Sequence, residues 1–300
     1  METLNGFLIL DKPLGATSSN VVVRVRRQLP KGTAVGHGGT LDPEASGVLP
    51  ICVGTATRLF DYIIDKQKTY VAELRLGEIT DTQDATGQVV ETRPVTCGEA
   101  EVRAALPGFV GEIEQIPPMY SAVKKDGRRL YQLARRGETV EMPARRCVIH
   151  GIEYLEQTDA RTHRLRVTCG KGVYIRTLCH DIGQALGCGA HMASLRRTAA
   201  GIFTLENACT PEQAEKLAQE GRLAEALIAP DAPLGHIPAV RVGAERLHAV
   251  KNGNTLRAEW LEEAPPAEGT VVRVYCGGAF AGMGEAQAEG SIRFKAMLLR

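Results

Sequence analysis

The chain has 300 residues, of which 44% are hydrophobic and 24% charged, and its formal net charge is +1. This composition is typical of a globular protein with a sizeable core, and the length predicts about two domains. The longest apolar run near the N-terminus, 7–10, is too short for a signal peptide or a membrane span. We therefore expect a cytoplasmic protein that does not enter the membrane.

The first third of the chain predicts strands and helices in alternation. The elements expected in chain order are a buried strand at 6–10, a helix at 21–29 with N-cap candidates at 17–20, a glycine-rich loop at 36–40, an apolar run at 47–54, a helix at 55–65 and a strand at 68–76. In the last of these, Tyr70, Ala72, Leu74 and Leu76 lie at every second position on one face, which is the period of a strand.

The remaining elements lack a regular strand–helix–strand repeat. We expect strands at 144–155 and 164–168, a helix at 173–186 ended by Gly187, a helical stretch at 210–229, a proline-containing linker at 230–238 and short strands after 240. The pattern predicts an α+β fold built on a mixed sheet. A domain at 1–230 would be followed by a small, mostly β domain at 236–300.

Charge and cysteine patterns give weaker indications. Residues 121–150 carry eight basic and three acidic side chains, whereas residues 61–101 carry four basic and nine acidic ones. A polyanion would therefore meet one basic face, although a solvated surface explains the same pattern. The eight cysteines form no C-x-x-C pair, and the spacing of Cys179, His180, Cys188 and His191 fits no standard zinc site. We expect reduced thiols and no metal site.

The segment from Gly36 to Pro50, GHGGTLDPEASGVLP, is the strongest candidate for a functional loop. It places Asp42 between glycines and beside an apolar strand, which suits a preorganised site. Taken alone, an Asp-Pro pair is more often a turn. Asp42 and Glu44 could also form a glycosidase pair, but two residues so close in a loop rarely face a sugar from both sides. Asp81 and Asp84 indicate a structured turn more than a cation loop.

The same segment resembles the catalytic loop of the TruB family of pseudouridine synthases. Six further segments match motifs of that family in order, namely Leu10-Asp-Lys-Pro-x-Gly15, Lys68-Thr-Tyr70, Asp81-Thr-x-Asp-x-x-Gly87, Ile116–Ala122, Lys171–Leu178, and Gly187–His191 with Leu195-Arg-Arg197. The resemblance spans residues 5–200, and the tail resembles a PUA domain, an RNA-binding module. Gly38, Glu44 and Val173 depart from the family pattern.

The resemblance implies an isomerase that converts a uridine of tRNA, position 55 in the T loop, into pseudouridine without a cofactor. It implies Asp42 as the catalytic residue, Arg176 as its cationic partner and Tyr70 against the base. Substrate-binding residues would be His37, Tyr174, Leu195 and Lys12. Residues on the RNA backbone would be Lys124, Lys125, Arg128 and Arg129, in a basic insertion at about 124–143, together with Arg196 and Arg197.

Two other functions use the same features. A non-catalytic RNA-binding protein or RNA chaperone would need the basic face and the PUA-like tail, but not Asp42, Tyr70 and Arg176 together. An N-glycosidase would share the carboxylate but would not retain the base. The sequence leaves open whether Asp42 acts as a nucleophile or as a base toward the sugar, and a monomer is the expected state.

Overall fold

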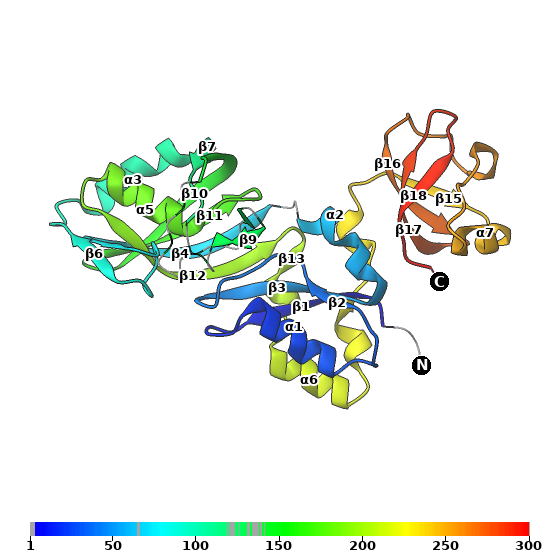
Figure 1. Ribbon diagram of the computed structural model, residues 1–300, viewed down its shortest axis with the longest axis horizontal. Helices are drawn as coiled ribbons and strands as arrows, with labels where there is room; N and C mark the ends of the chain where they lie inside the picture. The colour runs from blue at the N-terminus through cyan, green and yellow to red at the C-terminus, as the bar shows by residue number, and fades with distance from the viewer. Residues whose placement is uncertain are drawn as a thin grey trace.

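A computed structural model describes residues 4–64, 67–118, 120, 124, 125, 127–130, 133, 138, 140 and 142–299, with only the backbone at 64, 124, 125, 128 and 129. Figure 1 shows an elongated molecule, with a large sheet and its helices toward one end and a smaller β domain at the other. Among the described residues, ten strands form the large sheet and four the small one. The α+β fold with a small C-terminal β domain is confirmed.

The large sheet runs through most of the N-terminal part. Its strands are β1 (Gly6–Lys12), β2 (Val35–His37), β3 (Ala45–Val53), β4 (Lys68–Leu76), β7 (Gly111–Gln115), β10 (Arg145–Asp159), β11 (Thr162–Cys169), β12 (Ala190–Ala200), β13 (Phe203–Thr204) and β14 (Leu227–Ile228). The spatial order is β14-β1-β3-β12-β4-β11-β10-β7, with β2 beside β3 and β13 beside β12. β12 pairs in parallel with β3 and antiparallel with β4, so the sheet is mixed.

Both faces of the large sheet are covered. Along β1, successive side chains point to opposite faces, and both sets are buried. Leu8 and Leu10 point into one core, while Phe7 and Ile9 point into the other. The first core contains apolar side chains of α1 (Ser18–Arg27), α3 (Glu99–Ala105), α5 (Ile175–Ala185) and α6 (Pro211–Gln219). The second contains side chains of a 3-10 helix (Gly54–Leu59) and of α2 (Phe60–Ile64).

The small sheet has its own core. It comprises β15 (Ala239–Val242), β16 (Val271–Cys276), β17 (Ala279–Ala286) and β18 (Ile292–Met297), with α7 (Leu247–Lys251) beside it. Met283, Ala296 and Leu298 belong instead to the second core of the large sheet. The two domains therefore share an apolar contact. Two short ribbons, β5 (Glu78–Thr80) with β6 (Val89–Thr92) and β8 (Lys124–Lys125) with β9 (Arg128–Arg129), complete the described strands.

Local signals account for most element boundaries. Thr17 accepts a hydrogen bond from Asn20 N and caps α1, and Gly187, at φ +76°, ends α5. Two expected helices were wrong in extent. Residues 54–64 form a 3-10 helix followed by a short α-helix, and α6 ends at Gln219 because Gly221 adopts φ +71°. Each is shorter than apolar spacing alone predicts.

Candidate functional site

A cavity of about 380 Å³ opens where the middle strands of the large sheet end. Its lining comes from four segments that are far apart in the sequence. They are the loop after β2 (residues 39–42), Lys68 and Tyr70 on β4, the segment 170–176 that leads into α5, and Leu195 with Arg197 on β12. The mixed sheet brings these segments together because β12 lies between β3 and β4.

The loop that carries Asp42 is fixed from both sides. Ser18 Oγ, at the start of α1, both donates to Leu41 O and accepts from Leu41 N, each at 2.9 Å. Gly15 N donates to Pro43 O at 2.8 Å. With neighbouring backbone groups held on both sides, the Asp42 carboxylate has a defined position, and its side chain is 44% exposed toward the cavity.

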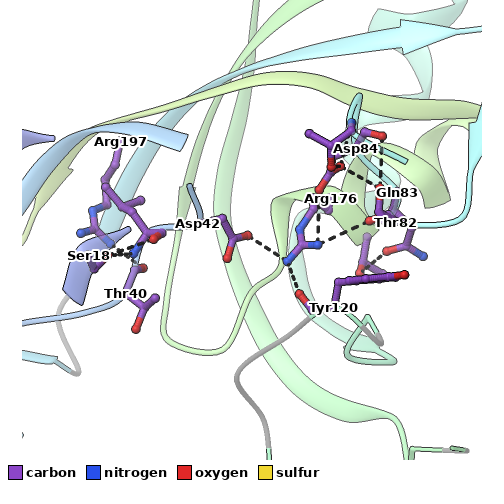
Figure 2. A network of polar contacts seen from close by, with 12 residues as sticks. Ser18, Thr40, Asp42, Thr82, Gln83, Asp84, Tyr120, Arg176 and Arg197 are labelled. Atoms are coloured by element: carbon purple, nitrogen blue, oxygen red, sulfur yellow. Dashed lines mark hydrogen bonds and ion pairs between the residues drawn. The ribbon is translucent and has the colours of Figure 1, made fainter. Parts of the chain in front are cut away.

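Asp42 forms an ion pair with Arg176, whose Nη2 lies 2.8 Å from Asp42 Oδ2 (Figure 2). Arg176 is the second residue of α5, and its side chain is only 6% exposed. Its Nη2 also donates to Tyr120 O at 2.9 Å, and its Nη1 to Thr82 O at 3.4 Å. A buried guanidinium with several acceptors keeps one orientation, so it fixes the carboxylate that it binds.

Asp84 is a second carboxylate on Arg176, at 3.4 Å from Nη1. Its Oδ1 accepts hydrogen bonds from Thr82 Oγ1 at 2.7 Å and from Thr86 Oγ1 and N at 2.6 and 3.0 Å. These bonds leave Oδ2 for the guanidinium. Gln83, beside it, has φ +63°, which few residues other than glycine adopt.

From the sequence, Asp84 was expected only as part of a structured turn. Its burial against Arg176 depends on contacts across the sheet, and the family-like motif 81–87 was the only signal that could have indicated it.

Gln115 was also missed by the sequence analysis. Its side chain accepts from Tyr174 N at 2.9 Å and donates to Tyr174 O at 3.2 Å. This pair of bonds fixes the backbone of Tyr174, the N-cap residue of α5, one position before Ile175 and two before Arg176. Gln115 is a buried strand residue with no distinctive sequence pattern, so its role could not be recognised without the fold.

The residues expected to contact the base are only partly brought together. Tyr70, Tyr174 and Leu195 line the cavity with Asp42. Burial raises the pKa of the Tyr70 hydroxyl, with a smaller opposing effect from Arg197. His37 lies on β2, outside the cavity lining. Its Nδ1 is buried without a hydrogen-bond partner among the described residues, and burial lowers its pKa.

Two predicted RNA contacts stay predictions, but their side chains are buried in this structure. Lys12, expected to bind substrate, is fully buried, and its ammonium donates to Pro13 O, Ala16 O and Pro43 O at 2.8, 2.6 and 3.3 Å. Burial lowers its pKa to about 8. Arg197, expected on the RNA backbone, is 1% exposed. Both cations are turned inward toward backbone carbonyls, so neither is available at the surface for RNA.

The remaining predicted phosphate contacts are of two kinds. Arg196 is 43% exposed and donates to Asp11 Oδ2 at 2.6 Å and to Ser46 Oγ at 3.3 Å. Arg196 is therefore at the surface, where it is hydrogen-bonded to Asp11 and Ser46. Lys124, Lys125, Arg128 and Arg129 form the β8–β9 ribbon, and their side chains lie outside the described part of the structure.

The fold and the site together define a class of enzyme. The crystal structure of a Cbf5-Nop10-Gar1 complex matches with a TM-score of 0.74 at 28% identity, covering 98% of this chain and 85% of the other. An H/ACA RNP bound to a substrate RNA containing 2'-deoxyuridine matches with a TM-score of 0.73 at 27% identity, covering 98% and 85%. The architecture is that of a pseudouridine synthase.

Sequence comparisons give the family. Residues 26–175 match the TruB family pseudouridylate synthase N-terminal domain, 176–232 the tRNA pseudouridylate synthase B C-terminal domain, and 238–298 the C-terminal domain of pseudouridine synthase II TruB. The tRNA pseudouridine synthase B of Cupriavidus pinatubonensis is 49% identical over 278 residues, covering 91% of this chain and 87% of that protein. That of Burkholderia mallei is 47% identical over 276 residues, covering 91% and 90%. The chain belongs to the TruB family of pseudouridine synthases, which are isomerases.

Within the described residues, no three His, Cys, Asp or Glu side chains are arranged to hold a metal ion. No helix of that part of the chain is long and apolar enough to cross a membrane.

Proposed function

We propose that the protein converts uridine 55 in the T loop of tRNA into pseudouridine, with Asp42 as the catalytic residue. The observation that carries the proposal is the 2.8 Å ion pair between the half-exposed Asp42 and the buried Arg176, inside the cavity. The family and the names of its tRNA-acting relatives support the substrate.

The reaction breaks the N1–C1′ bond of uridine and joins C5 of the same base to C1′. Atoms balance without a donor, because the C5 proton is lost and N1 gains one. In this proposal the Asp42 carboxylate acts on the sugar, either as a nucleophile at C1′ or as a base, and Arg176 holds it in place through their ion pair. An ionised carboxylate in a fixed position is what both routes require.

The base must leave the stacked RNA before the sugar can reach Asp42, at a cost of a few kcal/mol. In the proposal Tyr70 and Tyr174 provide aromatic surface and Leu195 an apolar wall, which together recover part of this cost. His37 would occupy the space that the base leaves. Because all proposed catalytic residues lie around one cavity, a single chain suffices for the reaction.

Binding to tRNA would come from a wider surface. Arg196 and the basic insertion at about 124–143 would contact phosphates, and the PUA-like domain would extend the contact. Phosphate contacts supply affinity, whereas the shape of the T loop selects the site.

The test is an unmodified tRNA transcript incubated with the protein, followed by nucleoside analysis. We expect pseudouridine at position 55, and none in a matched transcript with cytidine at that position. A protein that binds the transcript but forms no pseudouridine would instead be an RNA-binding protein or chaperone. Release of free uracil would indicate an N-glycosidase.

A further inference from the structure

Arg197 is among the largest fully buried side chains of the described part of the protein. Its Nε donates to Val48 O at 2.7 Å, its Nη2 to Gly39 O at 3.2 Å and its Nη1 to Thr40 O at 3.4 Å. Gly39 and Thr40 precede Asp42 in the catalytic loop, and Val48 lies in β3 after it. One guanidinium therefore spans the base of the loop, as Figure 2 shows for its contact with Thr40.

The same residue faces Tyr70. Arg197 and Tyr70 are paired directly across β12 and β4, so their side chains share one face of the sheet, and both line the cavity. On the other side Arg197 pairs with Gly47 of β3. A Cβ on Gly47 would lie 2.1 Å from Arg197 O, so β3 can approach this closely only with glycine there.

The charge of Arg197 is not matched by a neighbouring carboxylate. Ion pairs among the described residues include Arg176 and Arg196 but not Arg197. A buried cation without an ion pair among the described residues is costly, and protein structures usually pair such charges. This charge lies next to Tyr70 and lowers the pKa of its hydroxyl, against the larger effect of burial. It also lowers the pKa values of Lys12 and His37, for which burial is the larger cause.

We propose that Arg197 is a positioning residue that ties the Asp42 loop to the strand of Tyr70, and that its buried charge stabilises the Tyr70 phenolate during the reaction. The inference rests on the proposed function. It replaces the surface role first expected for this arginine.

The phenolate arises within a balanced proton sequence. When the N1–C1′ bond breaks, Tyr70 gives its proton to the released uracil ring. After C5 has joined C1′, the C5–H bond breaks, its electron pair stays in the ring, and the proton returns to Tyr70 Oη. Negative charge is on Tyr70 only between these two transfers. A fixed positive charge beside the Tyr70 oxygen lowers the energy of the phenolate that exists between the two transfers.

The test compares Arg197→Gln, which removes the charge, with Arg197→Lys, which keeps it. Arg166→Gln, at a 46% exposed arginine of β11 that lies outside the cavity lining, is the control. Each full-length variant is measured for tRNA affinity, for single-turnover pseudouridine formation at saturating tRNA, and for the pH dependence of that rate. Wild type and Asp42→Asn are run in parallel.

We expect Arg197→Gln to slow chemistry about a hundredfold or more, because both loop position and charge are lost, while affinity stays within about threefold. Its pH profile should move to higher pH by about one unit or more, since loss of the cation makes Tyr70 harder to ionise. Arg197→Lys should keep the wild-type profile at a reduced rate. If Arg197→Gln does not fold, Arg197→Lys still separates the two roles. A reduced rate at saturating tRNA indicates a positioning role, whereas weaker tRNA affinity with a normal rate indicates a surface contact with RNA.

Several charged or titratable groups face Tyr70 and could affect the pH dependence of the rate. They are Arg197 from β12, Asp42 from the loop and Cys169 from β11, with Lys68, Lys171 and Arg176 around the same cavity. All of them are unchanged in the two Arg197 variants, apart from Arg197 itself, so a displaced profile reports the lost charge.

Three results would overturn the inference. They are weakened affinity with unchanged chemistry at saturation, normal chemistry in Arg197→Gln, and slowed chemistry in Arg197→Gln without displacement of the pH profile. An Arg197→Lys rate at saturating tRNA equal to that of Arg166→Gln would also contradict it. Failure of the proposed function is distinguishable, because the wild type itself would then form no pseudouridine.

Discussion

Arg176 lies between two carboxylates of different exposure, and Asp42 is the one that faces the cavity. The Asp42 side chain is 44% exposed, whereas that of Asp84 is 10% exposed on the opposite side of the guanidinium. The buried carboxylate is fully occupied by hydrogen-bond donors, so it holds the arginine in place. The carboxylate of Asp42 is partly exposed, so its oxygens can be reached by a substrate in the cavity. This asymmetry is the basis for separating a catalytic from a positioning role.

Replacing Asp84 should therefore affect the rate without removing Asp42, the carboxylate that we propose as catalytic. We expect Asp84→Asn to slow single-turnover chemistry about tenfold to a hundredfold, because Arg176 loses the anion that orients it. Asp81→Asn, in the same turn but exposed, is the control and should stay within about threefold. An Asp84→Asn rate equal to that of the control would show that the second carboxylate does not position Arg176.

Tyr70→Phe and Tyr70→Leu should separate stacking from proton transfer. Stacking of a base on an aromatic ring contributes about 1–3 kcal/mol, and Phe retains it. A hydroxyl that transfers protons contributes about a hundredfold or more, and both variants lose it. We expect Phe to be severely slowed at saturating tRNA, with affinity nearly unchanged. A near-normal rate for Tyr70→Phe together with a reduced rate for Tyr70→Leu would show that Tyr70 only stacks on the base.

Charge reversal at Lys124, Lys125, Arg128 and Arg129 should weaken tRNA binding and flatten its dependence on salt. Each lost phosphate contact removes up to about one unit from the slope of log affinity against log salt concentration. The measurement is a titration at several salt concentrations, with chemistry at saturation as the control. An unchanged slope would place the RNA on another face.

Two glycines of the catalytic segment should differ sharply in their tolerance of a side chain. Gly47 has φ +103° and lies against the backbone of β12, so Gly47→Ala should cost more than about 2 kcal/mol in the free energy of unfolding. Gly38 has no such φ, and its added Cβ would meet the end of the Ile63 side chain at 2.9 Å. Gly38→Ala should therefore cost less than about 1 kcal/mol. Denaturant unfolding of both variants measures the difference, and equal costs would contradict the strand geometry.

The sequence predicted the elements whose signals are local. The strand at 68–76 follows its alternation of apolar residues, and the end of α5 follows Gly187. At the site, the loop motif indicated Asp42, and the family resemblance indicated four residues on other elements that line the same cavity: Tyr70, Tyr174, Arg176 and Leu195. Asp84 and Gln115 could not be identified, because their roles depend on contacts with α5 across the sheet.

The burial of Lys12 and Arg197 could not be predicted from the sequence either. A basic residue in a motif is usually expected at the surface, where its charge is solvated. Here both are buried because carbonyl groups of the loop segments converge on them, and this convergence is a property of the tertiary structure. Sequence spacing carries no information on the direction of those carbonyls.

The central claim is that the Asp42 carboxylate performs the chemistry while other residues bind the RNA. Asp42→Asn keeps the shape of the side chain and removes its charge, so it tests this claim most directly. The measurement is pseudouridine at position 55 under single-turnover conditions, with tRNA affinity determined for the same preparation. We predict no detectable turnover and an affinity close to that of the wild type, because binding depends mostly on phosphate contacts. Turnover near the wild-type rate would contradict the assignment.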